Sequence, residues 1–234
     1  MSTCPPGPAS RRPLGPGGHV VLAAALAASG GCAPAAPSVP AAPAAPAAPA
    51  ALDELGYERV APAFDDRWPA PLPGELGRAE PTHVLVPRLG IEAPLVVLGV
   101  SDGGELAVPP LDHAEVAGWY GGGPTPGERG SAVIAGHLDT RTGPAVFARL
   151  AELRKGDVVG VVRGDGTVAV FSVERTERAP KTSFPADEVY GATAERRLVL
   201  VTCGGAFDRR TRSYADNLIV HAMFRAAYAA GDLR

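Results

Sequence analysis

The stretch Arg196-Arg197-Leu198-Val199-Leu200-Val201-Thr202-Cys203-Gly204-Gly205 organises the rest of the chain. Its segment Leu198 to Val201 is a continuous apolar run rich in β-branched residues, which predicts a buried strand. We expect this strand to end at Cys203, because the two glycines that follow leave the thiol uncovered and allow close backbone approach. A cysteine that only fills space would fit the same pattern, since free cysteines often pack as small hydrophobic residues.

The composition restricts the class of protein. The 234 residues include 22 basic and 25 acidic side chains, a net charge of −3, which argues against a nucleic-acid-binding surface. A hydrophobic content of 46% suits a globular domain. Much of the proline lies in one tract near the front of the chain, however, so the folded part is shorter than the sequence.

The N-terminus has the pattern of a targeting segment. Arg11 and Arg12 precede an apolar run that ends near Ala28, and small residues lead from there to Cys32. We interpret residues 1–32 as a signal peptide or N-terminal membrane anchor, because the run is shorter than the roughly 20 residues of an ordinary membrane-spanning helix. Cys32 follows two glycines and partly resembles the lipobox of bacterial lipoproteins, so lipidation is one expectation beside cleavage or an uncleaved anchor. The expected location is extracytoplasmic, associated with membrane or cell wall.

The remaining chain divides into three parts. Residues 33–52 are almost entirely alanine and proline, which predicts a semi-rigid linker. Residues 53–80 are expected to form an N-terminal arm, and residues 81–226 the catalytic domain. Exported proteins usually pair their cysteines, but Cys4 and Cys32 lie in the targeting segment. The domain therefore offers Cys203 no second cysteine for a disulfide, which favours a reactive thiol.

The domain is expected to be mostly β, a barrel or sandwich of short strands joined by glycine turns. A helix is predicted over 145–153 from its apolar spacing, and a short helical turn within 184–190. We find no spacing of metal ligands and no phosphate-binding glycine motif, so no cofactor is expected. The predicted strands cover 82–86, 91–100, 105–108, 131–135, 158–162, 168–173, 198–203 and 218–222.

His137 and Cys203 are the candidate catalytic pair. Each follows a predicted strand and has glycine beside it, so both could face one cleft at the rim of a barrel. The thiolate is the nucleophilic form of cysteine, and a neighbouring imidazole can take the thiol proton and later pass it to a leaving amine. A guanidinium can balance the charge of the tetrahedral intermediate, and Arg209, Arg210 and Arg212 lie between Cys203 and the final strand. The other histidines of this region have no comparable setting: His83, His113 and His221.

These motifs resemble those of the sortases. Ala132–His137 is similar to the sortase histidine strand, and Leu198–Cys203 to the sortase TLxTC strand. The segments 204–208, 214–220 and 184–191 are similar to the actinobacterial class F sortases in particular. The resemblance covers about residues 81–222.

The resemblance implies a closed eight-stranded β-barrel with short helices and a His–Cys–Arg site. It implies cleavage of an LPXTG-type sorting signal between Thr and Gly through an acyl-thioester on Cys203, and transfer to an amine of the cell envelope. His137 would be the general acid and base. The implied partners are surface-protein sorting signals and the amine acceptor, with no nucleic acid and with membrane contact through the N-terminus alone.

The sequence departs from the family pattern at the position of the catalytic arginine. Asn217 occupies the position where most sortases carry it, and Ala215, two residues earlier, is not arginine either. We therefore expect Arg212, with Arg209 as the second choice, to position the substrate or the oxyanion. Two alternatives remain open: an exported cysteine peptidase that releases its product to water, and a non-catalytic β-barrel that binds the cell wall.

Overall fold

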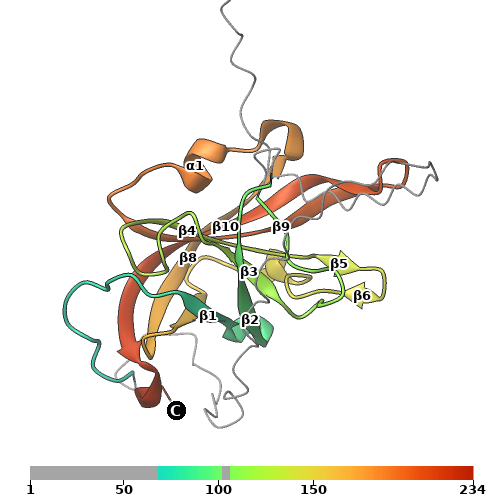
Figure 1. Cartoon of the computed structure of the whole chain (residues 1–234). Coiled ribbons are helices and arrows are strands. Elements are labelled where there is room, and N and C mark those ends of the chain that lie inside the picture. The colour runs from blue at the N-terminus through green and yellow to red at the C-terminus, as the bar shows by residue number, and fades with distance from the viewer. Residues whose placement is uncertain (1–67, 102–105, 234) are drawn as a thin grey trace, which may run out of the picture.

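The computed structural model describes residues 68–101 and 106–233, and its core is a β-barrel (Figure 1). The predicted class is therefore correct, as is the short helical turn before the cysteine strand. The expected targeting segment, the linker and most of the expected arm lie outside the described residues. The elements in chain order are β1 (Pro81–Val86), η1 (Pro87–Leu89), β2 (Ile91–Leu98), β3 (Ala117–Tyr120), β4 (Gly130–Gly136), β5 (Asp139–Thr140), β6 (Gly143–Pro144), η2 (Leu150–Glu152), β7 (Val158–Arg163), β8 (Thr167–Pro180), η3 (Lys181–Ser183), α1 (Ala186–Tyr190), β9 (Arg196–Asp208), β10 (Ser213–Ala229) and η4 (Ala230–Asp232).

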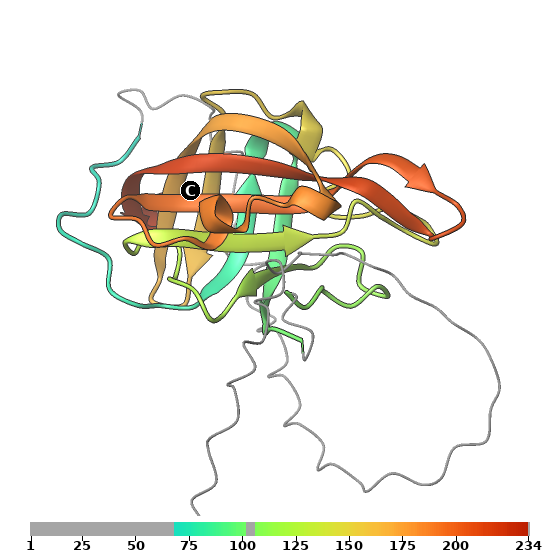
Figure 2. The same ribbon diagram turned by 90° about the horizontal axis from the view of Figure 1, so that it is seen from above.

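Eight strands close the barrel in the order β1-β2-β3-β4-β9-β10-β8-β7, and β7 pairs back to β1. The pairs β2–β3 and β4–β9 are parallel, and the other neighbours are antiparallel. Strand β10 is the longest of the barrel, and the hairpin that it forms with β9 projects beyond the barrel, as the view from above shows (Figure 2). The closed order leaves these eight strands without a free edge.

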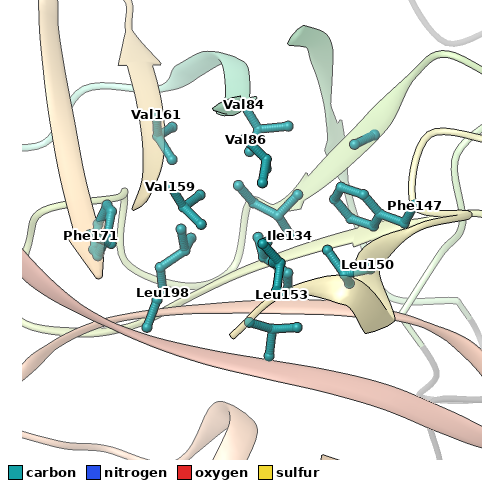
Figure 3. Close-up of a cluster of buried hydrophobic side chains, with 14 of the residues drawn as sticks. Val84, Val86, Ile134, Phe147, Leu150, Leu153, Val159, Val161, Phe171 and Leu198 are labelled. Carbon is teal, nitrogen blue, oxygen red and sulfur yellow. The ribbon is translucent and has the colours of Figure 1, made fainter. Parts of the chain in front are cut away.

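The barrel interior is filled by aliphatic and aromatic side chains from every wall (Figure 3). Alternation along the strands sends one set of side chains inward and the next set outward. Burying one such side chain stabilises the fold by about 1.5–3 kcal/mol. The labelled members of the cluster are Val84, Val86, Ile134, Phe147, Leu150, Leu153, Val159, Val161, Phe171 and Leu198.

The helix predicted over 145–153 is wrong. This segment is a series of turns that ends in η2, and it sends Phe147 and Leu150 into the core. Its amides bond to distant carbonyls, because Val146 N–H donates to Ala114 O at 2.7 Å and Phe147 N–H donates to His137 O at 3.0 Å. Those tertiary bonds replace the i−4 ladder of a helix.

Three strand predictions also need correction. The strand predicted over 105–108 is only a single bridge between Val100 and Leu106 within the described residues. Strand β9 does not end at Cys203 but continues to Asp208. Strand β10 extends far beyond 218–222 and includes most of the alanine-rich C-terminal segment, because β8 pairs with it from Asp216 to Ala229.

Residues 68–80 lie against the barrel as an extended segment. Trp68 packs on Tyr228 with ring centroids 5.1 Å apart, and Leu72 N–H donates to Ala227 O at 2.7 Å. The buried guanidinium of Arg163 donates to Gly77 O and to a carbonyl of the loop before β4. In residues 68–101 and 106–233, no helix has the length and apolarity needed to cross a membrane.

Buried histidines make the stability of this barrel depend on pH. Burial lowers the pKa of His83, and burial together with Arg175 lowers the pKa of His221. Below the ordinary value of 6.5 the unfolded chain therefore binds protons more readily than the folded chain, so the free energy of unfolding decreases as the pH is lowered. We expect a loss of up to about 1.4 kcal/mol per pH unit for each histidine below pH 6.5.

Urea unfolding at pH 7.5, 6.5 and 5.5 measures this loss. His83→Gln should reduce the slope of unfolding free energy against pH, and His113→Gln, at an exposed position, is the matched control. A slope that is identical in wild type and His83→Gln would contradict the prediction.

Candidate active site

The register of two parallel strands brings His137 and Cys203 together. The β4–β9 ladder pairs Ala135 with Val201, and His137 and Cys203 each lie two residues further along. Neighbouring strands are about 4.8 Å apart, so the two side chains start from the same level of adjacent strands. Both line one pocket.

The pair faces outward from the barrel. Ile134 and Leu200 belong to the interior cluster, whereas Ala135 and Val201 belong to a second cluster beneath α1. Since side chains alternate along a strand, residues two positions beyond Ala135 and Val201 continue the outer face. The site therefore lies on the outer face of the sheet, where the β9–β10 hairpin begins.

The pocket has a volume of about 120 Å³ and is mostly apolar. The segment after Leu106 contributes one wall, β5 and the residue before it another, and the β9–β10 hairpin a third. Its lining residues are Val108, Leu111, His137, Leu138, Asp139, Cys203, Phe207, Arg212, Ser213 and Tyr214.

His137 is buried and its tautomer is fixed by a backbone carbonyl. Its Nε2–H donates to Pro109 O at 2.8 Å, and the residue is only 6% exposed to solvent. A neutral imidazole that donates at Nε2 has Nδ1 free of a proton, so Nδ1 is the atom that can accept one. The contact with Pro109 thus orients the ring as a general base requires.

Cys203 is a buried thiol whose environment opposes ionisation overall. Burial is the largest influence and raises the pKa of the thiol, and the Asp139 carboxylate raises it further. Lys181 acts in the opposite direction through its charge and a hydrogen bond. A neighbouring base promotes ionisation of a buried thiol, and the imidazole of His137 lines the same pocket.

The hairpin separates the two expected arginines. Arg209 lies at the exposed tip, and Arg212 lines the pocket with a left-handed backbone, φ 54°. Asn217 is paired with Cys203 across β9–β10 and is fully buried, and Ala215 lies at an irregularity in the same ladder. Of the two arginines expected from sequence, Arg212 is the one placed beside the thiol.

Four polar residues near Cys203 were missed by the sequence analysis: Asp139, Lys181, Ser213 and Tyr214. Tyr214 O–H donates to the Asp139 carboxylate, which raises the pKa of the phenol to about 12, and the Tyr214 ring packs on Phe207 at 5.0 Å. Lys181 Nζ donates to Ser213 Oγ at 2.9 Å. Lys181 is one of only two lysines in the chain, a signal that could have been noticed, but Asp139 and Tyr214 carry no local signal.

The described ranges contain no group of three His, Cys, Asp or Glu side chains placed to hold a metal ion. His83 and His221 lie away from the pocket: His83 is on β1, and His221 Nε2 lies 3.2 Å from a Glu177 carboxylate oxygen.

Comparison with solved structures finds sortases of several bacteria. Sortase C1 of Streptococcus agalactiae is 19% identical, with a TM-score of 0.47 over 61% of this chain and 66% of that one. Sortase C of Streptococcus pneumoniae is 23% identical, with a TM-score of 0.47 over 61% of this chain and 64% of that one. The SrtA sortase of Actinomyces oris is 26% identical, with a TM-score of 0.49 over 70% of this chain and 88% of that one. The match thus spans slightly less than two thirds of the two streptococcal proteins.

The family assignment rests on the sequence match. No curated protein sequence matches the chain significantly. Residues 84–225, more than half of the chain, match the family described as the sortase domain, and they include β4, β9 and every residue that lines the pocket. The chain belongs to the sortase family.

Proposed function

We propose that this protein is a cysteine transpeptidase of the class F type that cleaves an LPXTG-type sorting signal and joins it to an amine of the cell envelope. The observation that carries the proposal is the placement of His137 and Cys203 at one level of adjacent parallel strands, in one pocket. The family membership of residues 84–225 supports the same chemistry.

The proposed first half-reaction forms a thioester. The Cys203 thiol gives its proton to Nδ1 of His137, and Sγ attacks the carbonyl carbon of the threonine. The C–N bond to glycine then breaks, and His137 returns the proton to the leaving amine. The imidazole ends neutral, and the acyl group is held on Cys203.

The second half-reaction releases the thioester. An acceptor amine attacks the acyl carbon, and His137 takes the proton that the amine loses. The Sγ–C bond then breaks, and His137 passes this proton to Sγ, which regenerates the thiol and the neutral imidazole. Water in place of the amine would give the peptidase alternative with the same residues. The apolar wall of Val108, Leu111 and Phe207 suits the aliphatic side chains of a sorting signal and limits the access of water.

Intact mass spectrometry of the full chain tests this function. Wild-type protein incubated with an LPXTG-type peptide and an amine should show an acyl adduct and an amine-linked product. An adduct with only hydrolysed product would favour the peptidase, and the absence of any adduct across several sorting peptides would favour the wall-binding barrel.

The arginine assignment gives a second expected result. Arg212→Ala should lower kcat/KM for transpeptidation by about tenfold, because Arg212 lines the pocket and its guanidinium can hold a carbonyl or oxyanion. Arg209→Ala, at the hairpin tip, should change it less than about twofold. Steady-state kinetics of the two variants measures both values, and equal losses in both would overturn the assignment.

The location follows from the same proposal. We propose that residues 1–32 direct export and leave the domain at the outer face of the membrane or in the cell wall, with residues 33–52 as a spacer. The localisation of a fluorescent fusion, with and without residues 1–32, tests this. A Cys32→Ala variant that loses a lipid-sized mass would identify a lipoprotein.

A further inference from the structure

Lys181 is a buried cation beside the candidate nucleophile. It begins η3, directly after β8, and is only 8% exposed. The last pair of the β8–β10 ladder is Pro180 with Asp216, so the next residues are Lys181 and Ala215. The same Asp216 pairs with Gly204 of β9, next to Cys203. The register therefore brings Lys181 to the end of the ladder at which the thiol lies.

The contacts of Lys181 point into the site. Its Nζ donates to Ser213 Oγ at 2.9 Å, and Ser213 and Cys203 line the same pocket. Its charge and a hydrogen bond also lower the pKa of Cys203, against the larger effect of burial. A buried ammonium costs several kcal/mol of desolvation unless an anion or several acceptors compensate it. A thiolate at Cys203 is an anion that offers this compensation.

We propose that the Lys181 ammonium stabilises the Cys203 thiolate, and that it supplies the buried positive charge of this active site. Neither Ala215 nor Asn217 carries a charge, and Arg212 is exposed on the hairpin. A buried charge acts through a lower effective dielectric than an exposed one, so Lys181 has the stronger influence on the sulfur. Its use in catalysis rests on the function proposed above, but the stabilisation of the thiolate does not.

The other titratable groups around the thiol define what the test must separate. His137 follows β4, Asp139 is on β5, and Tyr214 and Arg212 come from the hairpin. Asp139 raises the pKa of Cys203 and is itself hydrogen-bonded by Tyr214. Changing Lys181 alone leaves these groups in place, so a shift of the Cys203 profile reports on the ammonium.

The rate of alkylation of Cys203 by iodoacetamide, measured against pH on the full chain, tests the proposal. Only the thiolate reacts, and peptide mass spectrometry separates Cys203 from Cys4 and Cys32, which serve as internal references. Lys181→Met should move the Cys203 profile to higher pH and slow alkylation at pH 7 by about tenfold. Lys181→Arg should remain within about threefold of wild type, because it keeps the charge.

Lys155→Met is the matched control, since Lys155 is the other lysine of the chain and lies in an exposed turn. Its profile should superimpose on that of wild type. Lys181→Gln gives the comparison with Lys181→Arg if the methionine variant does not fold, as judged by circular dichroism. Profiles of the uncharged variants that superimpose on wild type, or an arginine variant as slow as they are, would overturn the proposal.

The assay also separates this proposal from the proposed function, because alkylation needs no sorting peptide. A shifted profile without transpeptidation would retain the thiolate stabilisation and reject the transpeptidase. Normal transpeptidation with an unshifted profile in Lys181→Met would reject the role of Lys181 alone.

Discussion

Cys203→Ser is expected to reduce transpeptidation at least about a thousandfold while leaving the binding of a sorting peptide unchanged. Serine keeps nearly the volume of cysteine at this buried position, so the pocket should keep its shape. Its hydroxyl ionises far less readily than a thiol, and His137 alone cannot make it an equivalent nucleophile. The change therefore removes the bond-forming atom and little else.

Two measurements on the same variant make this result decisive. Product formation is followed by mass spectrometry, and peptide affinity by fluorescence anisotropy of a labelled sorting peptide. A variant that binds but does not turn over fits the transpeptidase. If wild type binds the peptide without ever forming an adduct, and Cys203→Ser behaves identically, the non-catalytic barrel is the better description.

His137→Gln is expected to lower the rate of acyl transfer by about a hundred- to ten-thousandfold. The amide of glutamine can still donate to Pro109 O, as the Nε2–H of His137 does, but it cannot accept and return a proton. The variant thus separates the acid–base role of the ring from its role in holding the Pro109 segment.

His137→Ala loses both roles and should show the same chemical defect together with a lower melting temperature. His113→Gln, at an exposed position outside the pocket lining, is the control and should retain full activity. Single-turnover kinetics isolates the acylation step, so slow product release cannot mask the effect. Retention of more than about a tenth of the wild-type rate by His137→Gln would remove His137 from the mechanism.

Local sequence patterns were enough to predict the parts of the site that are carried by single strands. The apolar run Leu198–Val201 forms a buried strand, and the run before His137 forms its neighbour. Strands as apolar as these two are stable only when they are buried. The sequence contains many such short strands joined by glycine turns, and this pattern predicts a barrel or sandwich. The candidate pair of His137 and Cys203 could be predicted from these runs, because each residue comes directly after an apolar run that forms a strand.

Longer-range contacts decided the rest. Phe147 and its neighbours have the spacing of a helix, but their amides bond to carbonyls of other segments as the side chains fill the barrel. Strand β9 continues past Cys203 because β10 is long enough to pair with it, although two glycines suggested an end.

The charged groups around the thiol also separate what local sequence predicts from what tertiary contacts decide. The sequence determined that this chain is a mostly β protein with a histidine and a cysteine at comparable strand positions. Only the tertiary structure placed Lys181, Asp139 and Ser213 beside the sulfur, and it placed Arg212 there but not Arg209. The physical reason is that hydrogen bonds and charge interactions between segments distant in sequence depend on strand register and packing, which no local pattern encodes.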